Sequence, residues 1–302
     1  MSEAAELLKV DHLTKVYAGR SGFLGKRQEF RAVDDVSFTI KEGETLGLVG
    51  ESGSGKSTIG RAVLMLDPPT SGSIELSGRD LNVWTAKDHL WLRKNMQPVF
   101  QDPFASLNPR MRVGDFAAEP LAIHRVGKSG AERREIIAET FKMVGLQPDF
   151  ARRYPHELSG GQRQRVCIAR AVALQPRLIV CDEPISALDV SIQAQVINLL
   201  MDLQESLGMA YLMISHDLSM VRHICHRVAV LYRGHIVELG DTSSVYGNPS
   251  HPYTRLLLSS VPRLKASDTP RFDPQTSRQE LGAMEMALPL REVEQGHWAA
   301  II

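Results

Sequence analysis

Short, mainly apolar runs recur along the chain, and each one ends in small or polar side chains. They occupy residues 44–49, 177–183 and 211–215, and their length is typical of strands buried on both faces of a sheet. Helical patterns lie between them, for example at residues 57–66 and 131–144. Buried strands that alternate with helices indicate an α/β fold.

Other segments alternate apolar and polar positions, which is typical of strands with one exposed face. Residues 36–40 alternate in this way before a turn at residues 42–43. Residues 228–232 and 235–239 form a second alternating pair joined by Arg-Gly, which predicts a hairpin. The glycine-containing residues 18–30 are expected to form an exposed insertion.

Residues 50–57 form a glycine-rich loop between the first buried run and the helix predicted after it. Their sequence fits G-x-x-x-x-G-K-[ST], in the strand–loop–helix setting that this phosphate-binding motif requires. Small residues let the loop wrap closely around phosphates, and the helix N-terminus adds about half a positive charge. Lys56 is expected to reach the β- and γ-phosphates, and the Ser57 hydroxyl to ligate Mg²⁺. The nucleotide-binding residues predicted here are Gly50, Glu51, Ser52, Gly53, Ser54, Gly55, Lys56, Ser57 and Thr58.

Two acidic residues end the second buried run. Asp182 stands at the carboxyl edge of this strand, where a carboxylate is suited to holding Mg²⁺ through water. Glu183 beside it is the candidate general base, which would orient and activate the attacking water. An acidic pair after a strand is also an ordinary start to a polar loop, so this interpretation depends on the residues around it.

Two single polar residues follow other strand-like segments. His216 comes directly after the third buried run, and Gln101 follows residues 97–100. One histidine among ten is usually a surface residue or a satisfied core residue, and a lone glutamine is usually a solvated loop amide. Spacing alone therefore assigns neither residue to a site.

The run Leu-Ser-Gly-Gly-Gln at residues 158–162 opens a helical pattern that continues through residues 163–171. Ser159 is a favourable N-cap residue, and the two glycines leave backbone N–H groups accessible. An anion would sit well at such a helix end. A capped basic helix is the structural alternative, and it explains the arginines of the helix but not the preceding run.

Together these motifs resemble those of ATP-binding-cassette (ABC) ATPases, in which the run at residues 158–162 is the signature sequence. The resemblance implies a P-loop core with an antiparallel β subdomain and an inserted helical subdomain. It implies that Gln101 is the Q-loop residue that touches Mg²⁺ and the water. It also implies that His216 bonds the γ-phosphate and holds Glu183 and the water in line. Residues 182–189 resemble the Walker B segment and the D-loop.

The resemblance also implies a composite site, because the signature helix faces the γ-phosphate held by the P-loop of an opposite subunit. An aromatic residue at the position of Tyr17 stacks on adenine in this family, whereas a tyrosine that simply packs at a strand end is the alternative. The further nucleotide contacts implied are Tyr17, Ser159, Gly160, Gly161, Gln162 and Asp189. The implied Mg²⁺ residues are Ser57, Gln101 and Asp182.

Four further segments narrow the resemblance to the ATPases of oligopeptide and dipeptide importers. They are residues 31–38, 101–110, 154–157 and 248–254, and the similarity covers about residues 7–262. It implies an ATP-hydrolysing subunit that energises a binding-protein-dependent importer, with oligopeptides or dipeptides as the expected cargo. Some relatives end in a cysteine cluster that can hold an iron–sulfur centre. No cysteine follows residue 225, so we expect no such cluster.

The partners that the resemblance implies are a second, related ATPase subunit and two membrane-spanning permease subunits. An extracytoplasmic substrate-binding protein would deliver the cargo. The ATPase does not touch the cargo, so importers of nickel, opines or sugars are alternatives, as is an exporter. A non-transport ABC ATPase that acts on ribosomes or DNA is a further alternative. Zero formal net charge, from 35 basic and 35 acidic residues, speaks against a nucleic-acid partner.

The length of 302 residues allows one large domain or two modest ones. We expect a single ABC ATPase domain at residues 1–262, with the helical subdomain inserted at about residues 102–172. Residues 263–302 lack strong periodicity and are expected to form a loosely packed C-terminal tail. Internal repeats are not visible, which indicates one cassette.

The chain has no apolar run near the ~20 residues that cross a bilayer, and residues 1–6 lack the features of a secretion signal. We therefore expect a peripheral protein at the cytoplasmic face of the inner (plasma) membrane, held there by its partners. The three cysteines are widely spaced, which fits reduced thiols and argues against a metal site.

Overall fold

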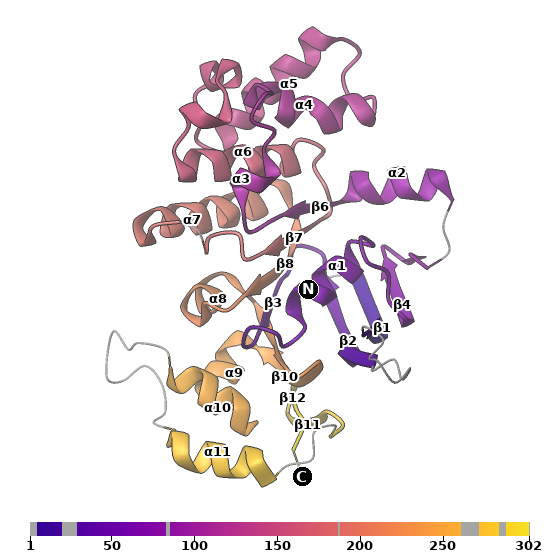
Figure 1. Ribbon diagram of the computed structural model, residues 1–302, viewed down its shortest axis with the longest axis vertical. Helices are drawn as coiled ribbons and strands as arrows, with labels where there is room; N and C mark the ends of the chain where they lie inside the picture. The colour runs from indigo at the N-terminus through magenta and orange to yellow at the C-terminus, as the bar shows by residue number, and fades with distance from the viewer. Residues whose placement is uncertain are drawn as a thin grey trace. The chain divides into compact units, whose positions relative to one another are not determined.

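The structure is a computed structural model (Figure 1). The chain divides into two units, each built from the helices and strands described below. The first unit combines residues 1–82 with 212–302, and the second contains residues 83–211. The structure describes residues 5–19, 29–82, 85–186, 188–260, 272–283 and 288–301. Most of the insertion expected at residues 18–30 lies outside these described residues.

An antiparallel sheet with the order β2-β1-β4-β5 forms part of the first unit (Figure 1). Its strands are β1 (Glu6–Ala18), β2 (Glu29–Lys41), β4 (Ser71–Leu76) and β5 (Arg79–Asp80). The alternating side chains of Val36, Phe38 and Ile40 are buried, so the predicted one-sided strand is confirmed. Strand β1 continues to Ala18, and its second half still pairs with β2.

A second sheet of the first unit supports the phosphate-binding loop. The strand order of this sheet within the first unit is β11-β12-β10-β9-β3-β8, with β3 parallel to β9 and β10 antiparallel to β9. These strands are β3 (Thr45–Val49), β8 (Ala210–Ser215), β9 (Arg227–Tyr232), β10 (His235–Asp241), β11 (Arg291–Glu294) and β12 (His297–Ala299). Every residue of β3 and β8 is buried, which explains why the sequence reveals them as continuous apolar runs. The predicted hairpin of β9 and β10 is confirmed.

Helices of the first unit follow its strands or lie near the C-terminus. They are α1 (Lys56–Val63), α8 (Leu218–Ile224), α9 (Thr242–Gly247), α10 (Pro252–Ser259) and α11 (Pro274–Ala283). Residues beyond 262 contribute α11 and the β11–β12 hairpin, and β12 pairs with β10. His297 and Ala299 of β12 are buried. The segment expected to be loosely packed therefore includes a paired strand, which is too short to give a periodic pattern.

The second unit is mainly helical, around the parallel strands β6 (Met96–Val99) and β7 (Leu178–Asp182). Its helices are α2 (Ala86–Asn95), α3 (Pro103–Ser106), α4 (Val113–Ile123), α5 (Gly130–Met143), η1 (Pro148–Arg152), η2 (Pro155–Glu157), α6 (Gly160–Val172) and α7 (Val190–Leu207). Arg170 of α6 joins two of them, because its guanidinium lies 4.4 Å from the Phe116 ring of α4 and donates to the Phe116 carbonyl. This unit extends beyond the expected insertion of about residues 102–172 at both ends.

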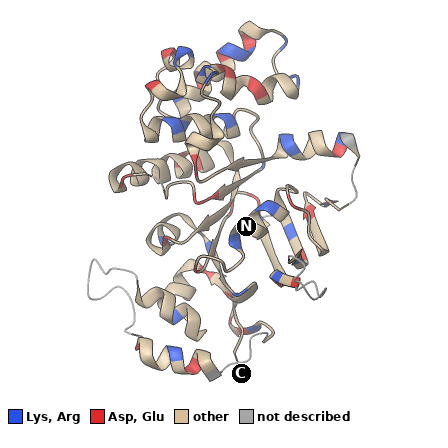
Figure 2. Ribbon diagram, in the orientation of Figure 1, with Lys and Arg blue, Asp and Glu red and all other residues tan. Residues whose placement is uncertain are grey.

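Charged residues of both signs are interspersed along the helices and strands of each unit (Figure 2). The cysteines Cys167, Cys181 and Cys225 are all buried. Burial raises the pKa of the Cys167 thiol to about 12 and also raises the pKa of Cys181. Within the described part of the chain, no helix has the length and apolar character needed to cross a membrane.

Candidate nucleotide-binding site

The loop after β3 has a backbone that only glycine can follow at two positions. Gly50 has φ +150° and Gly55 has φ +111°. A Cβ on Gly50 would lie 2.2 Å from the Leu231 carbonyl oxygen, and a Cβ on Gly55 would lie 2.5 Å from the Ala32 carbonyl oxygen. The loop is therefore held tightly against neighbouring backbone, in a conformation that side chains would block.

Lys56 begins helix α1 and is buried against the loop that precedes it. Its ammonium donates to the carbonyl oxygens of Gly50, at 2.7 Å, and Glu51, at 2.8 Å. Ser57 and Thr58 follow in the first turn of the helix. A buried ammonium, a glycine loop and a helix N-terminus together suit the phosphates of a nucleotide.

Tyr17 lies in β1, in the same unit as the loop. Its hydroxyl donates to Asp67 at 2.6 Å, and the Lys15 ammonium lies 5.3 Å from the ring centroid. Burial raises the pKa of the Tyr17 phenol, Asp67 acts in the same direction, and a hydrogen bond to Thr58 of α1 opposes them. The hydrogen bond from Lys15 lowers the pKa of Asp67, and the bond from Tyr17 adds to this effect. The structure therefore places Tyr17 beside the first turn of the P-loop helix.

His216 is exposed directly after β8, also in the first unit. The next residue, Asp217, caps helix α8 by accepting from the N–H groups of Ser219 and Met220. The Ser215 hydroxyl accepts from the Asp217 N–H at 2.9 Å. These bonds fix the turn from which the His216 side chain extends.

Asp182 ends strand β7 in the second unit, and Glu183 follows at φ +50°. A left-handed backbone is uncommon outside glycine, and Glu183 is one of eight non-glycine residues that adopt it in the described part of the chain. The Ser186 N–H and hydroxyl both donate to the Glu183 carbonyl, at 3.3 Å and 3.2 Å. The turn after the strand thus holds Glu183 in its unusual conformation. Asp189 is the exposed N-cap residue of α7.

The signature run forms the capped helix start that its sequence predicts. The Ser159 hydroxyl accepts from the Gln162 N–H at 3.3 Å, and the Gln162 side chain accepts from the Ser159 N–H at 2.9 Å. This reciprocal pair is a capping box, and Gly160 and Gly161 form the first turn between its members. Gln101 is exposed before α3 in the same unit.

The structure therefore places the loop, Tyr17 and His216 in the first unit, and the other predicted site residues in the second. One contact to the loop was missed by the sequence analysis. The Glu51 N–H donates to the Tyr253 hydroxyl at 2.9 Å, although the two residues are 202 positions apart. Tyr253 belongs to residues 248–254, one of the segments that carried the family resemblance. This resemblance was the only indication in the sequence that Tyr253 belongs near the site.

Comparisons with known proteins agree with this geometry. The family model "ABC transporter" matches residues 33–186, and the model "Oligopeptide/dipeptide transporter, C-terminal region" matches residues 237–286. The oligopeptide transport ATP-binding protein OppF of Bacillus subtilis is 47% identical over 97% of this chain and 95% of its own length. A second oligopeptide transport ATP-binding protein of Bacillus subtilis, AppF, is 54% identical over 85% of this chain and 78% of its own length.

A solved structure, the dimeric post-hydrolysis state of the ATP-binding cassette MJ0796 bound to ADP and Pi, is similar to this chain with a TM-score of 0.69. The two are 33% identical, and the match covers 78% of this chain and 99% of that one. The fold and the loop thus define a nucleotide-binding cassette ATPase. The chain belongs to the ABC transporter family, as an ATP-hydrolysing subunit of the oligopeptide/dipeptide type.

Proposed function

We propose that the chain hydrolyses ATP to energise the import of oligopeptides or dipeptides. The match of residues 237–286 to the C-terminal region of oligopeptide/dipeptide transporters carries this proposal, because that region lies outside the cassette motifs common to all ABC ATPases. The names of two similar relatives, both oligopeptide transport ATP-binding proteins, support the same cargo class.

Within the site, Lys56 binds the β- and γ-phosphates and the N–H groups of residues 50–58 surround them. Ser57, Gln101 and Asp182 would hold Mg²⁺, since each carries an oxygen donor of the kind that this cation prefers. When bound, the cation neutralises charge on the phosphates. Glu183 accepts a proton from the attacking water, and its place beside Asp182 at the end of β7 supports this role.

Two subunits are needed for a complete site, with the signature helix of one facing the P-loop of the other. The capping box leaves the start of α6 ordered for such a contact, and the similar cassette structure is dimeric. A second ABC ATPase subunit, two permease subunits and, indirectly, an extracytoplasmic binding protein complete the importer. His216 bonds the γ-phosphate, Tyr17 stacks on adenine, and Asp189 contributes from the D-loop. The complex holds the chain at the cytoplasmic face of the inner (plasma) membrane.

Residues 1–262 form the ABC ATPase domain in this proposal, and about residues 102–172 form its inserted helical subdomain. The surface that contains Gln101 and the helices after it would receive the permease subunits. Residues 263–286 of the C-terminal tail belong to the region that distinguishes the oligopeptide type, since the C-terminal family match extends to residue 286.

Glu183→Gln tests the chemistry. Loss of a general base costs about 10²–10⁴-fold in rate, so single-site turnover of the complex should fall by that factor while ATP still binds. Glu205→Gln removes the same charge from an exposed position of α7 and should turn over normally. Lys56→Ala should weaken nucleotide binding itself. Normal single-site turnover by Glu183→Gln would contradict the assignment.

The transport role is tested by purifying the tagged chain from gently solubilised membranes. A second ATPase and two permease subunits should co-purify, and a peptide-loaded binding protein should raise ATP turnover. If only a nickel- or sugar-loaded binding protein raises ATP turnover, the cargo is nickel or a sugar and not a peptide. Recovery of the chain alone or with ribosomes would refute the importer.

A further inference from the structure

The contact between Tyr253 and the P-loop acts on one particular peptide group. This group joins Gly50 to Glu51, and its carbonyl oxygen accepts from the Lys56 ammonium at 2.7 Å. Its N–H donates to the Tyr253 hydroxyl at 2.9 Å. The peptide is thus held at both ends, once by the phosphate-binding lysine and once by a residue of helix α10.

The orientation of this peptide decides the conformation of the loop. Gly50 has φ +150°, a region that residues with side chains rarely adopt, so several rotations of the peptide are open to it. Hydrogen bonds at both ends select one of them. Loss of either bond lowers the population of the loop conformation that the structure displays, and a ligand that needs this conformation then binds more weakly.

Tyr253 is itself rigidly placed. Its side chain is 1% exposed, and its ring centroid lies 4.3 Å from that of Tyr232 at the end of β9. Burial raises the pKa of the Tyr253 phenol to about 12, so the hydroxyl is neutral at physiological pH. The Tyr253 N–H donates to the His251 ring nitrogen Nδ1 at 3.1 Å, which caps the start of α10.

A buried carboxylate holds the turn that precedes Tyr253. Glu238 of β10 is 0% exposed and accepts from the N–H groups of Ser250, at 2.7 Å, and His251, at 3.0 Å. Its third partner is the ring nitrogen Nε2 of His297, at 2.7 Å, on strand β12. A buried carboxylate requires such donors, so the C-terminal strand, the turn and Tyr253 form one connected structure.

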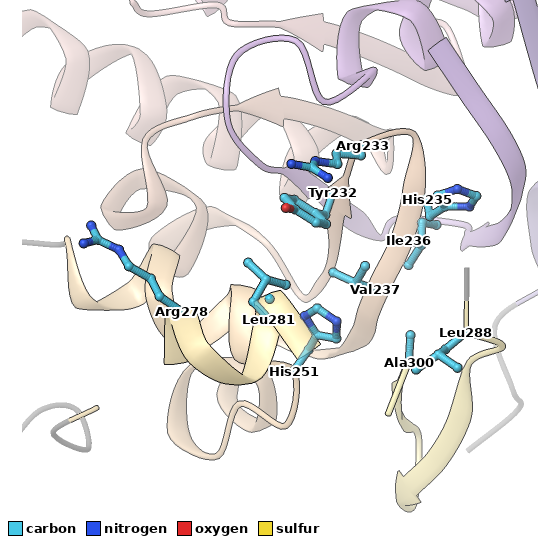
Figure 3. A pocket seen from close by; sticks show the side chains of 11 residues that line it. Tyr232, Arg233, His235, Ile236, Val237, His251, Arg278, Leu281, Leu288 and Ala300 are labelled. Carbon is cyan, nitrogen blue, oxygen red and sulfur yellow. The ribbon is translucent and has the colours of Figure 1, made fainter. Parts of the chain in front are cut away.

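A cavity of about 330 Å³ lies beside this structure (Figure 3). Tyr232 and His251, the two neighbours that hold Tyr253, both line it, and Leu281 of α11 lines it as well. Tyr253 does not line the cavity. The C-terminal helix therefore shares a boundary with the supports of Tyr253 but not with the tyrosine itself.

We propose that Tyr253 is a positioning residue for the P-loop, through which the C-terminal region of this chain sustains its affinity for nucleotide. The inference rests on the P-loop as the ATP site of the proposed function. Tyr253 touches neither phosphate nor water in this role. It acts through the backbone of Glu51, and the hydrogen bond that its hydroxyl accepts from the Glu51 N–H matters to ATP binding more than to the rest of the fold.

Tyr253→Phe removes only the hydroxyl and keeps the ring against Tyr232. Loss of one hydrogen bond of ordinary strength corresponds to about a five-fold change in an equilibrium. The Kd of the full-length chain for ATP, measured by calorimetry, should rise by about five-fold. In the assembled transporter KM for ATP should rise by a similar factor with kcat unchanged.

Tyr246→Phe is the matched control. Tyr246 is also buried in the first unit, and its hydroxyl donates to the Leu218 carbonyl at 2.7 Å rather than to the loop. Both variants should lower the melting temperature, but only Tyr253→Phe should change the Kd for ATP. Equal Kd values for the two variants would overturn the proposal and make Tyr253 a structural residue. Unchanged binding by Lys56→Ala would instead overturn the P-loop as the ATP site, and this inference with it.

Discussion

Alanine substitution should separate the two signature glycines, because they have different neighbours. A Cβ added to Gly160 would lie 3.5 Å from the Leu188 side chain, which is an ordinary contact. A Cβ added to Gly161 would lie 2.6 Å from Cγ2 of Ile192 on α7. This methyl group is attached directly to the β-carbon of a branched residue in a helix, so it has little freedom to move.

The expected free energies of unfolding follow from these contacts. Replacing a helical glycine by alanine stabilises a protein by about 0.4–1 kcal/mol where the space is open. Both glycines lie in the first turn of α6 with helical backbone, so both variants gain this amount. Overpacking against Ile192 costs a further ~1–3 kcal/mol at Gly161 only. Gly161→Ala should therefore be about 1–3 kcal/mol less stable than Gly160→Ala.

Thermal melting and ATP turnover of the assembled complex test the pair together. Gly160→Ala should melt at or above the wild-type temperature and still lose turnover, because its methyl group adds bulk where the phosphate of the partner site is expected. Gly161→Ala should melt several degrees below Gly160→Ala and should also lose turnover. Equal melting temperatures would refute the packing argument. Full turnover by Gly160→Ala would refute the contact between this helix end and a phosphate.

Substitutions at two further positions give separate tests. Tyr17→Phe loses the bond to Asp67 but keeps the ring, so its affinity for ATP should be nearly that of the wild type. Tyr17→Ala should lose about 0.5–1.5 kcal/mol of ATP-binding free energy in titrations. Equal affinities of Tyr17→Phe and Tyr17→Ala would contradict stacking. Burial lowers the pKa of His251 from 6.5 to about 4; the charge of Glu238 opposes this shift and that of Arg255 adds to it. The contribution of the neutral His251 ring to stability is therefore complete above pH 6.5 and falls as the pH drops to 4. The loss is about 3 kcal/mol, and melting curves of His251→Asn, which retains a capping acceptor, should lack this part of the pH dependence; identical pH profiles would refute it.

Local patterns predicted the strand and the helix on either side of the glycine-rich loop. Strand β3, the loop and helix α1 are adjacent in sequence, and full burial of β3 makes its apolar run visible. Strand β8 is also fully buried, and in β7 only the last residue, Asp182, is partly exposed. The cap at Ser159 was also predicted, because a capping box spans only four residues and depends on residue types rather than on distant packing.

Contacts between distant segments could not be predicted in this way. The Glu51 partner of Tyr253 is a backbone N–H, which every non-proline residue has, so no residue type marks the pair. Tyr17 donates to Asp67, and only the pairing of β1 with its neighbours brings them together. Strand β12 spans three residues and contains a buried histidine whose partner, Glu238, lies 59 positions earlier. Periodicity requires longer segments than this to be recognised.

The burial of all three cysteines makes the chain suitable for site-specific labelling. Thiol reagents attack the thiolate, and burial keeps Cys167 and Cys181 protonated at neutral pH. A cysteine introduced at an exposed position would then be the reactive one. Phe30, 61% exposed in the first unit, and Ile123, 57% exposed in the second, offer one such position in each unit. A donor and an acceptor dye at these two positions would report the distance between the units as ATP binds and is hydrolysed.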